Sequence, residues 1–315
     1  MNFKKIFGEI NIVSQCKKYH LPIWQCPHFI FLIMGFLIFI SSLFAYILGN
    51  RYIQDPLLVA LLTIFLTGVF FVFGFILVRG FENLAEANRL KSEFVSIVSH
   101  QLRSPLSNLR WVLELIMSGK IEPVSQKQLE YFKILKENSD RMGELIKDLL
   151  IISRIETARL PIRNENFSLG DLVNSLITDF KPLAEASNVK IELKEEKNLP
   201  KTFGDPSKIK LVVENLLDNA IRYIKGKGEV KINLKHQKNK IYFEIEDNGV
   251  GIPKEDQKYI FQKFFRSENI LKYQTQGTGL GLHISKYIVE KSGGKIGFKS
   301  QEGKGSTFWF TVPIK

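Results

Sequence analysis

A histidine on an amphipathic helical segment is the first group in the sequence that could do chemistry. Apolar side chains recur at helical spacing along residues 92–116, and at about 100° per residue they share one face. The members of this stripe are Phe94, Val98, Leu102, Leu109, Val112 and Ile116. His100 lies about 200° from Val98 on the same wheel, so its ring nitrogens are expected to be exposed and free to react. Taken alone, an exposed histidine on a helix is more often a solvated residue than a nucleophile.

A second set of polar residues lies in the segment that begins at Asp205 and Pro206. An aspartate followed by a proline is typical of a helix start. Asn215, Asn219 and Arg222 follow at spacings i, i+4 and i+7, which put them on one helical face opposite the apolar residues. Carboxamide oxygens are suitable ligands for Mg²⁺, and a neighbouring arginine suits phosphate oxygens. A merely polar helix face is the alternative for this segment.

Two glycine clusters follow the asparagine helix. In the first, residues 247–253, Asp247 ends a predicted strand and could accept a hydrogen bond from the amine of adenine. Gly249 and Gly251 would let the backbone approach the adenine ring. The second cluster, residues 277–282, leads into a predicted helix whose first N–H groups would face an anion such as a triphosphate. Neither cluster matches a Walker loop, and a lone glycine cluster is not specific.

An aromatic segment, Phe261–Arg266, lies between the two clusters and precedes about ten polar residues. Phe264 and Phe265 could form the hinge of a lid over the site. A surface loop with core aromatic residues is the alternative.

The elements that must position these groups are of two kinds. Helical patterns cover about 83–118 and 125–158, with a turn at Gly119–Pro123. The second helix has its own apolar stripe, and two such faces cannot both be buried in a lone hairpin. A symmetric pairing of two hairpins into a four-helix bundle can bury both. After Pro161, strand patterns at 189–193, 229–236, 240–247, 295–300 and 307–312 alternate with helical segments, which predicts an α/β layer domain.

Two apolar segments precede the helices. Residues 29–48 and 57–78 are predominantly apolar segments of about 20 and about 22 residues without a charge, long enough to span a bilayer as helices. Lysines and arginines flank both outer ends, so both termini are expected in the cytoplasm, with 49–56 as a short exported loop. A cleaved signal peptide followed by a buried helix is the alternative, but the preceding 28 residues are too long for it.

Composition narrows the function class. The chain has 315 residues, of which 45% are hydrophobic, so it is not a disordered chain. Two cysteines exclude a disulfide-stapled secreted scaffold. The formal net charge of +12 alone would fit nucleic acid, anionic lipid or a phosphorylated substrate.

The order of these segments resembles the bacterial sensor histidine kinases of two-component systems, over residues 92–315. Ser99–Leu106 resembles the H-box, Glu214–Tyr223 the N-box, and Phe261–Arg266 the F-box. The two glycine clusters resemble the G-boxes. The other ATPases of the same superfamily are the alternative identity, but they lack the upstream histidine helix.

The resemblance implies a multi-domain membrane protein with two transmembrane helices, a helical hairpin that forms a four-helix bundle in a homodimer, and a C-terminal α/β sandwich that binds ATP. We expect a cytoplasmic segment at 1–28, transmembrane helices at 29–48 and 57–78, and the short exported loop 49–56 between them. A linker at 79–93 is expected to lead into a dimerisation and phosphotransfer domain at 94–158. The ATP-binding domain is expected at 159–315. The linker is too short for the four-helix relay module common in the family, so the second transmembrane helix could continue directly into the His100 helix.

The resemblance also implies roles for individual residues. His100 would attack the γ-phosphate of ATP, and Asn219 would hold Mg²⁺. The other residues expected to bind ATP are Asn215, Arg222, Tyr223, Asp247, Gly249, Gly251, Ile252, Phe264, Arg266, Gly277, Thr278, Gly279, Leu280, Gly281 and Leu282. Phosphorylated His100 would then donate to an aspartate of a separate cytoplasmic response regulator. The positive charge is thereby explained by ATP, an acidic regulator and membrane lipid, without direct nucleic acid binding.

The sequence departs from the family pattern directly after the histidine, where Gln101 replaces the usual Glu or Asp. A glutamine can accept a hydrogen bond from Nδ1–H and hold the tautomer, but it cannot offer a negative charge to the imidazolium. We therefore expect an active but slower kinase. Ser104 stands where the family often has Thr or Asn, so phosphatase activity toward the regulator stays open. A membrane-anchored scaffold with a degenerate kinase domain is the alternative function.

A final group, Cys16, His20, Cys26 and His28, precedes the first apolar segment. These residues could bind Zn²⁺ or form a thiol switch, but their spacing matches no standard zinc site. Ordinary juxtamembrane residues are the more common explanation.

Overall fold

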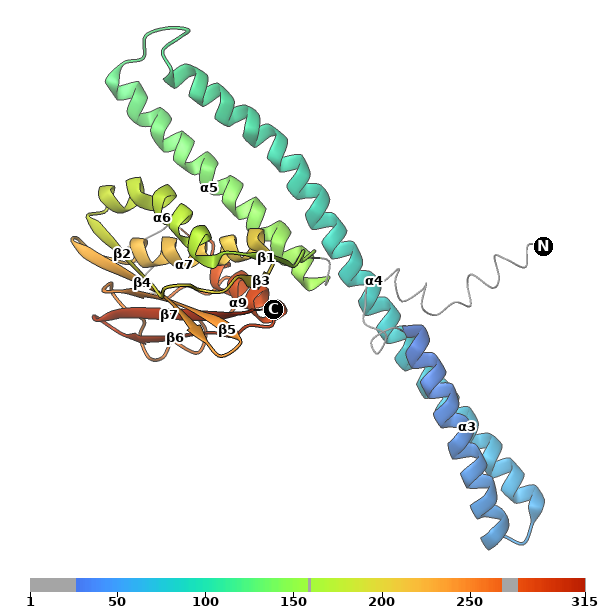
Figure 1. Cartoon of the computed structure of the whole chain (residues 1–315). Coiled ribbons are helices and arrows are strands. Elements are labelled where there is room, and N and C mark those ends of the chain that lie inside the picture. The colour runs from blue at the N-terminus through green and yellow to red at the C-terminus, as the bar shows by residue number, and fades with distance from the viewer. Residues whose placement is uncertain (1–26, 158–159, 268–276, 315) are drawn as a thin grey trace. The chain divides into compact units, whose positions relative to one another are not determined.

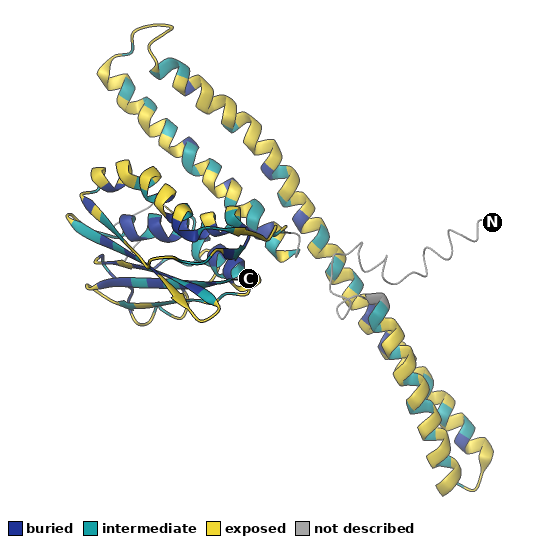
Figure 2. Cartoon of the chain, viewed as in Figure 1, coloured by how far each residue is buried: buried dark blue, intermediate teal, exposed yellow. Residues whose placement is uncertain are grey.

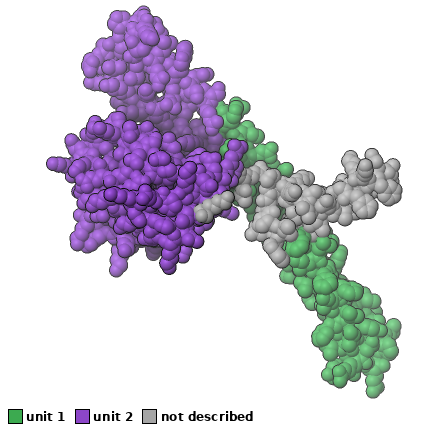
Figure 3. Space-filling model, in the orientation of Figure 1, with its two compact units in different colours: residues 1–101, 153–160 green, residues 102–152, 161–315 purple. Residues whose placement is uncertain are grey.

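The computed structural model describes residues 27–157, 160–267 and 277–314. The chain divides into two compact units, residues 1–101 with 153–160 and residues 102–152 with 161–315 (Figure 3). The first unit holds the apolar segments and His100, and the second holds both glycine clusters.

A hairpin of two apolar helices makes up most of the described part of the first unit (Figure 1). α3 spans Pro27–Tyr52, and α4 spans Pro56–Met117. Only residues 53–55 lie between them, so part of the segment 49–56, which was predicted as a short exported loop, is helical. The reason is local: the first helix continues through Tyr52, and the Asp55 carboxylate caps the second by accepting a hydrogen bond from the Leu57 N–H at 3.0 Å.

The two apolar helices touch through small and polar side chains. A Cβ at Gly49 would lie 2.6 Å from Cγ1 of Val59, so glycine allows the close approach. The hydroxyls of Ser42 and Thr67 hydrogen-bond to each other between the helices. The remaining side chains are mostly exposed (yellow in Figure 2): no residue is buried in the most apolar window of α3, and 11% are buried in that of α4. Both helices are long and apolar enough to cross a membrane, and their exposure is unlike that of core helices.

α4 is a single helix of 62 residues that runs from the second apolar segment through His100. The expectation that the apolar helix continues into the histidine helix is therefore confirmed, and the predicted helix start near residue 83 is not. Pro105 lies inside α4. Because proline has no N–H, the helix lacks the hydrogen bond to the carbonyl of Gln101, directly after the histidine.

α5, Gln126–Glu156, follows α4 after a turn at the predicted position. Gly119 in this turn has φ +65°, the left-handed conformation that glycine adopts without strain. The Ser125 N–H donates to Oε1 of Gln128 at 2.9 Å, which caps the start of α5. Arg110 and Asp140 form an ion pair of 2.7 Å that joins the two helices.

The apolar stripes predicted on the two helices are not buried within one chain. Leu102, Leu109 and Leu145 are 45%, 48% and 40% exposed, whereas Leu113 and Ile146 are buried. This agrees with the expectation that a lone hairpin cannot bury both apolar faces, because within one chain the buried positions are others, such as Leu113 and Ile146. The stripes are left on the surface.

The C-terminal part of the second unit, residues 161–314, is a sheet with helices packed on one face (Figure 1). The sheet order is β2-β4-β5-β7-β6, with β2 and β4 parallel and the other pairs antiparallel. The strands are β2 (Val189–Glu195), β4 (Gly228–Gln237), β5 (Lys240–Asp247), β6 (Ile296–Gln301) and β7 (Gly305–Pro313). The covering helices are α6 (Leu169–Ala186), α7 (Pro206–Arg222) and α9 (Gly281–Lys291). This arrangement confirms the predicted α/β layers, and each predicted strand is found within two residues at either end.

A second, two-stranded sheet was not predicted. β1 (Glu165–Phe167) pairs antiparallel with β3 (Thr202–Gly204). Asp205 follows β3 directly and caps α7, and its other carboxylate oxygen accepts a hydrogen bond from the Arg163 N–H at 2.9 Å. Burial by itself would raise the pKa of Asp205, but these hydrogen bonds outweigh it and lower the pKa below its usual value.

Candidate functional site

The polar face of α7 lines a cavity of about 690 Å³ in the second unit. α7 takes this orientation because its other face is packed into the core, with Val213, Leu217 and Ala220 buried. Asn215, Asn219, Arg222 and Tyr223 all line the cavity, together with Asp247 and the second glycine cluster. The structure thus brings together residues that lie up to 67 positions apart in the sequence, as predicted, in a volume that suits a nucleotide.

Asn215 and Asn219 occupy different places on the cavity wall. Nδ2 of Asn215 donates to the Gly281 carbonyl at 3.2 Å and to Oγ of Ser285 at 3.3 Å, so this side chain joins α7 to α9. Asn219 lines the cavity one turn later. Asn219 therefore remains the residue proposed to bind the metal.

Asp247 is buried at the end of β5. Its Oδ1 accepts hydrogen bonds from the Gly249 N–H at 2.8 Å and the Ser306 N–H at 3.3 Å. Burial, only partly offset by these hydrogen bonds, raises the pKa of Asp247 to about 6. A carboxylate with one oxygen held by the backbone can present the other to a ligand amine.

Backbone carbonyl groups lie so close to the glycines of the first cluster that they leave no room for a side chain. A Cβ at Gly249 would lie 2.5 Å from the carbonyl oxygen of Tyr223, and one at Gly251 would lie 2.0 Å from that of Gln301. Gly251 also has φ +67°. The cluster therefore packs against the residue after α7 and the last residue of β6, which is a more specific reason for glycine than approach to a ligand ring. The Ile252 N–H donates to Oγ of Ser300 at 2.8 Å, and Ile252 lines the cavity.

The second glycine cluster leads into α9. Gly277 and Gly279 have φ +115° and +69°, and a Cβ at Gly279 would lie 2.9 Å from the backbone carbon of Phe264. Oγ1 of Thr278 accepts a hydrogen bond from the Leu280 N–H at 3.1 Å. α9 starts at Gly281 without a side-chain cap, so its first N–H groups are available to an anion. Leu282 lines the cavity, and Leu280 is buried.

The aromatic segment before the cluster contacts the same loop. Phe264 is 63% exposed with φ +61°, an uncommon backbone conformation outside glycine. The Phe265 ring lies against Tyr259, with ring centroids 5.5 Å apart. Nη1 of Arg266 donates to the Gly277 carbonyl at 3.2 Å. The lid predicted to follow, residues 268–276, lies outside the described residues.

Arg222 and Tyr223 end α7 at the cavity. Nε of Arg222 lies 2.6 Å from Oδ2 of Asp218, one turn earlier. The Tyr223 carbonyl accepts a hydrogen bond from the Val250 N–H at 3.0 Å, and burial raises the pKa of the Tyr223 hydroxyl.

The residues present fit ATP with a divalent cation. The cavity has a carboxylate at the end expected to read an amine and uncapped helix N–H groups at the end expected to bind phosphate. Among the described residues, no three His, Cys, Asp or Glu side chains group in a way that could hold a metal ion by themselves. A cation here would be bound by a carboxamide and by phosphate oxygens, the coordination that Mg²⁺ commonly adopts with nucleotides.

His100, Gln101 and Ser104 are all exposed on α4, as the helical wheel predicted for His100. His100 and Gln101 belong to the first unit, and Ser104 belongs to the second. The candidate zinc or thiol group is not tested, because Cys16, His20, Cys26 and the side chain of His28 lie outside the described residues.

Carboxylates of α5 also line the cavity, and sequence reasoning missed them. Asp140, Glu144 and Asp148 all contribute to its wall. Oδ2 of Asp148 accepts a hydrogen bond from Oγ1 of Thr278 at 2.7 Å. In the sequence these are ordinary acidic residues on the polar side of an amphipathic helix, so no local signal distinguishes them.

Two family profiles match the chain. The His Kinase A (phospho-acceptor) domain matches residues 90–158, and the histidine kinase-, DNA gyrase B-, and HSP90-like ATPase matches residues 204–315. The first range contains His100, and the second contains the whole polar face of α7 and both glycine clusters.

Relatives of known function agree with these profiles. The chain is 32% identical over 234 residues to the sensor histidine kinase GacS of Pseudomonas protegens, covering 73% of this chain and 25% of that protein. It is 30% identical over 239 residues to the alginate biosynthesis sensor protein KinB of Pseudomonas aeruginosa, covering 76% and 40%. The chain thus spans between a quarter and two fifths of the length of these curated relatives.

A solved structure supports the fold. The crystal structure of full-length ShkA in complex with AMPPNP is similar with a TM-score of 0.59 and 23% identity, over 71% of this chain and 46% of that one. With a phosphoacceptor domain at 90–158 and an ATPase domain at 204–315, the chain belongs to the sensor histidine kinases of two-component systems.

Proposed function

We propose that the protein transfers the γ-phosphoryl group of ATP to its own His100 and then to an aspartate of a response regulator. The observation that supports this most directly is the grouping of Asn219, Asp247 and the second glycine cluster around one cavity, on a chain whose exposed His100 lies within the phosphoacceptor profile. Intact site residues favour an active kinase over a degenerate scaffold.

In the proposed reaction, a ring nitrogen of His100 attacks the γ-phosphorus in line with the leaving group. A P–N bond forms, the bond between the γ-phosphorus and the bridging oxygen breaks, and ADP leaves with the electron pair. Gln101 directly follows His100 in the sequence. Its side chain would accept a hydrogen bond from Nδ1–H of the imidazole, which would leave Nε2 as the nucleophile.

Residues of the ATPase domain bind and orient the nucleotide in this proposal. Asp247 accepts a hydrogen bond from the adenine amine, and the N–H groups at the start of α9 bind phosphate oxygens. Asn219 would hold Mg²⁺, with Asn215 behind it and Arg222 near the phosphates. The metal would neutralise charge that develops on the phosphate oxygens.

A homodimer is proposed because the apolar stripes of α4 and α5 are exposed in one chain. Leu102, Leu109, Val112, Met142 and Leu145 are each at least 40% exposed. Pairing with a second hairpin in a four-helix bundle would bury both stripes at once. The phosphoacceptor profile is that of a domain that dimerises in its family.

A membrane location is proposed from α3 and the first part of α4. Both helices are apolar on nearly all sides, with mean hydropathy of 2.5 and 2.7 in their most apolar windows. Since α3 and α4 are joined by residues 53–55 alone, both termini would lie on the same side, and the flanking basic residues favour the cytoplasm.

A separate response regulator is the proposed acceptor. A crystal structure similar to this chain, with a TM-score of 0.51 and 22% identity, contains the histidine kinase ThkA in complex with the response regulator protein TrrA. Ser104, exposed one turn after His100, would be available to orient water if the protein also dephosphorylates its regulator.

The test is incubation of the full chain in lipid nanodiscs with γ-³²P-labelled ATP and Mg²⁺. We expect label in the wild type and in His236→Gln, a matched control on the exposed end of β4, and none in His100→Gln. Label retained by His100→Gln would place the phosphoacceptor elsewhere. An unlabelled wild type would favour the scaffold.

A further inference from the structure

A carboxylate of α5 holds the loop that is expected to bind phosphate. Oδ2 of Asp148 lies 2.7 Å from Oγ1 of Thr278, in the middle of the second glycine cluster. Because the same hydroxyl accepts a hydrogen bond from the Leu280 N–H, its single proton is directed to Asp148. Both residues lie in the second compact unit.

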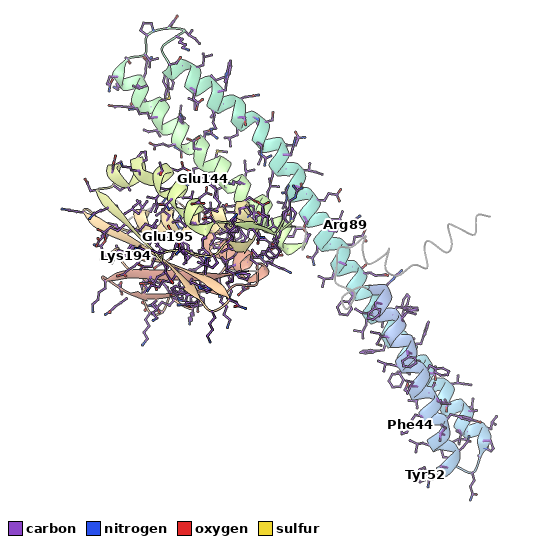
Figure 4. All side chains as sticks on the ribbon, in the orientation of Figure 1. Phe44, Tyr52, Arg89, Glu144, Lys194 and Glu195 are labelled. Atoms are coloured by element: carbon purple, nitrogen blue, oxygen red, sulfur yellow. The ribbon has the colours of Figure 1, made fainter. Side chains whose placement is uncertain are left out.

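Asp148 is not the only acidic group at this wall. Glu144, one turn earlier on α5 and labelled in Figure 4, lines the same cavity, and so does Asp218 of α7. Partial burial raises the pKa of both Glu144 and Asp148. The positive charge of Arg222 partly offsets this effect by lowering the pKa of Glu144, which indicates that the two side chains interact.

Arg222, one of the basic side chains that line the cavity together with Arg141, Lys147 and Arg266, already interacts with carboxylates. Arg222 lies 2.6 Å from Asp218 and within electrostatic range of Glu144. No three of the described acidic side chains come together as a metal site, so a shared cation does not explain their presence. A carboxylate and a phosphate bind the same kinds of partner, namely hydroxyl and N–H donors and a guanidinium.

We propose that Asp148, assisted by Glu144, is an intramolecular competitor of the nucleotide polyphosphate, so that contact of α5 with the second glycine cluster opposes ATP binding. This inference rests on the proposed kinase function. In the contacted state Thr278 is engaged, and carboxylates of α5 lie on the same cavity wall as the basic side chains that a triphosphate would use. ATP binding and the Asp148–Thr278 contact then exclude one another, and a movement of α5 that breaks the contact would favour ATP.

In this proposal Asp148 competes with the phosphate groups of the ligand and not with its adenine. The proposal can therefore be tested by comparing ligands with and without phosphate. Adenine would be read by Asp247, which hydrogen-bonds only to Gly249 and Ser306 in the contacts above and not to α5. Removing the α5 carboxylate should therefore change the affinity for polyphosphate ligands while leaving the affinity for adenosine unchanged.

The experiment measures binding of AMPPNP and of adenosine, by calorimetry, to the full chain in lipid nanodiscs. Variants are Asp148→Asn, which removes the charge, and Asp148→Ala, which also removes the hydrogen-bond acceptor. The control is Glu130→Gln, an exposed acid on α5 that does not line the cavity. We expect AMPPNP to bind about tenfold more tightly to both Asp148 variants, within the usual 5–150-fold range of such couplings. Adenosine affinity should be unchanged, and Glu130→Gln should match the wild type.

Three results would overturn the proposal. Weaker or unchanged AMPPNP binding in both Asp148 variants would show that the carboxylate does not compete. An equal gain for adenosine would point to a general opening of the cavity. Binding of neither ligand to any protein would remove the proposed function as well, so the two failures can be told apart without measuring phosphorylation.

Discussion

Nδ2 of Asn215 lies 3.2 Å from the carbonyl oxygen of Gly281, and this contact fixes the start of α9 against α7. A Cβ at Gly281 would lie 3.2 Å from the Asn215 carboxamide, so the close approach also depends on the glycine. The N–H groups proposed to bind phosphate are thus positioned by a residue of the same helix face that carries the proposed metal ligand, Asn219. Asparagine is a poor helix former, and this tertiary contact accounts for its cost at position 215.

Asn215→Ala should loosen α9 and weaken nucleotide binding. The variant loses hydrogen bonds to Gly281 and Ser285, each worth about 0.5–1.5 kcal/mol. Hydrogen exchange should accelerate over residues 281–286 in the full chain. Asn174→Ala is the matched control, since Nδ2 of Asn174 also makes two hydrogen bonds, to the Gly170 carbonyl at 3.0 Å and to Oε2 of Glu195 at 3.4 Å, neither of them on α9. Unaltered exchange at the start of α9 would refute the positioning role.

Adenosine binding should strengthen as the pH rises through about 6. The pKa of Asp247 is raised to about 6 by burial, and only the ionised carboxylate is a full acceptor for the adenine amine. Adenosine is the ligand to use, because it has no phosphate that titrates in this range. Affinity measured between pH 5 and 8 should rise and then level off. A flat profile would show that Asp247 does not read the base.

Asp247→Asn should lose adenosine binding and yet be more stable above pH 7. The folded state raises the pKa of Asp247 from 3.8 to about 6, so the folded protein binds the proton more tightly than the unfolded chain does. The unfolding free energy therefore falls as pH rises from about 4 to 6, and the ionised group costs roughly 2–4 kcal/mol above that window. Thermal unfolding of both proteins at pH 5 and pH 8 tests this. The advantage of the variant should appear at pH 8 and shrink at pH 5.

The sequence predicted the longer elements because their patterns are local. The strand at 240–247 alternates buried and partly exposed positions in the structure, and α7 is marked by its Asp205 cap and its apolar face. β1 and β3 were missed because three residues carry no periodicity and each becomes a strand only by pairing with the other.

The site was predicted in composition but not in its supporting contacts. Asn219, Asp247 and the glycines do line one cavity, yet the reasons for Gly249 and Gly251 are carbonyl oxygens of Tyr223 and Gln301, which no local pattern reveals. Asp148 was missed for the same reason. Its partner Thr278 is 130 residues away, and nothing in the composition of α5 singles it out.

Gln101→Glu should speed autophosphorylation. A carboxylate at this position would stabilise the imidazolium that forms on His100 and could take its proton, help that is commonly worth about 10²–10⁴-fold. Part of this is already supplied by the glutamine, so we expect a gain of about 10- to 100-fold in the initial rate of label incorporation. AMPPNP affinity should not change, since Gln101 is not among the residues of the cavity wall. An unchanged or lower rate would mean that Gln101 is not limiting.

Insertions near Asn88 should change kinase activity according to helical phase. α4 is unbroken from Pro56 to Met117, so the apolar segment and His100 are rotationally coupled. One inserted residue turns the two parts by about 100° relative to each other, whereas seven residues restore the phase to within about 20°. We expect one- and two-residue insertions to move autophosphorylation strongly up or down, and a seven-residue insertion to leave it near the wild-type level. Equal rates for all three insertions would show that the helix does not transmit rotation to His100.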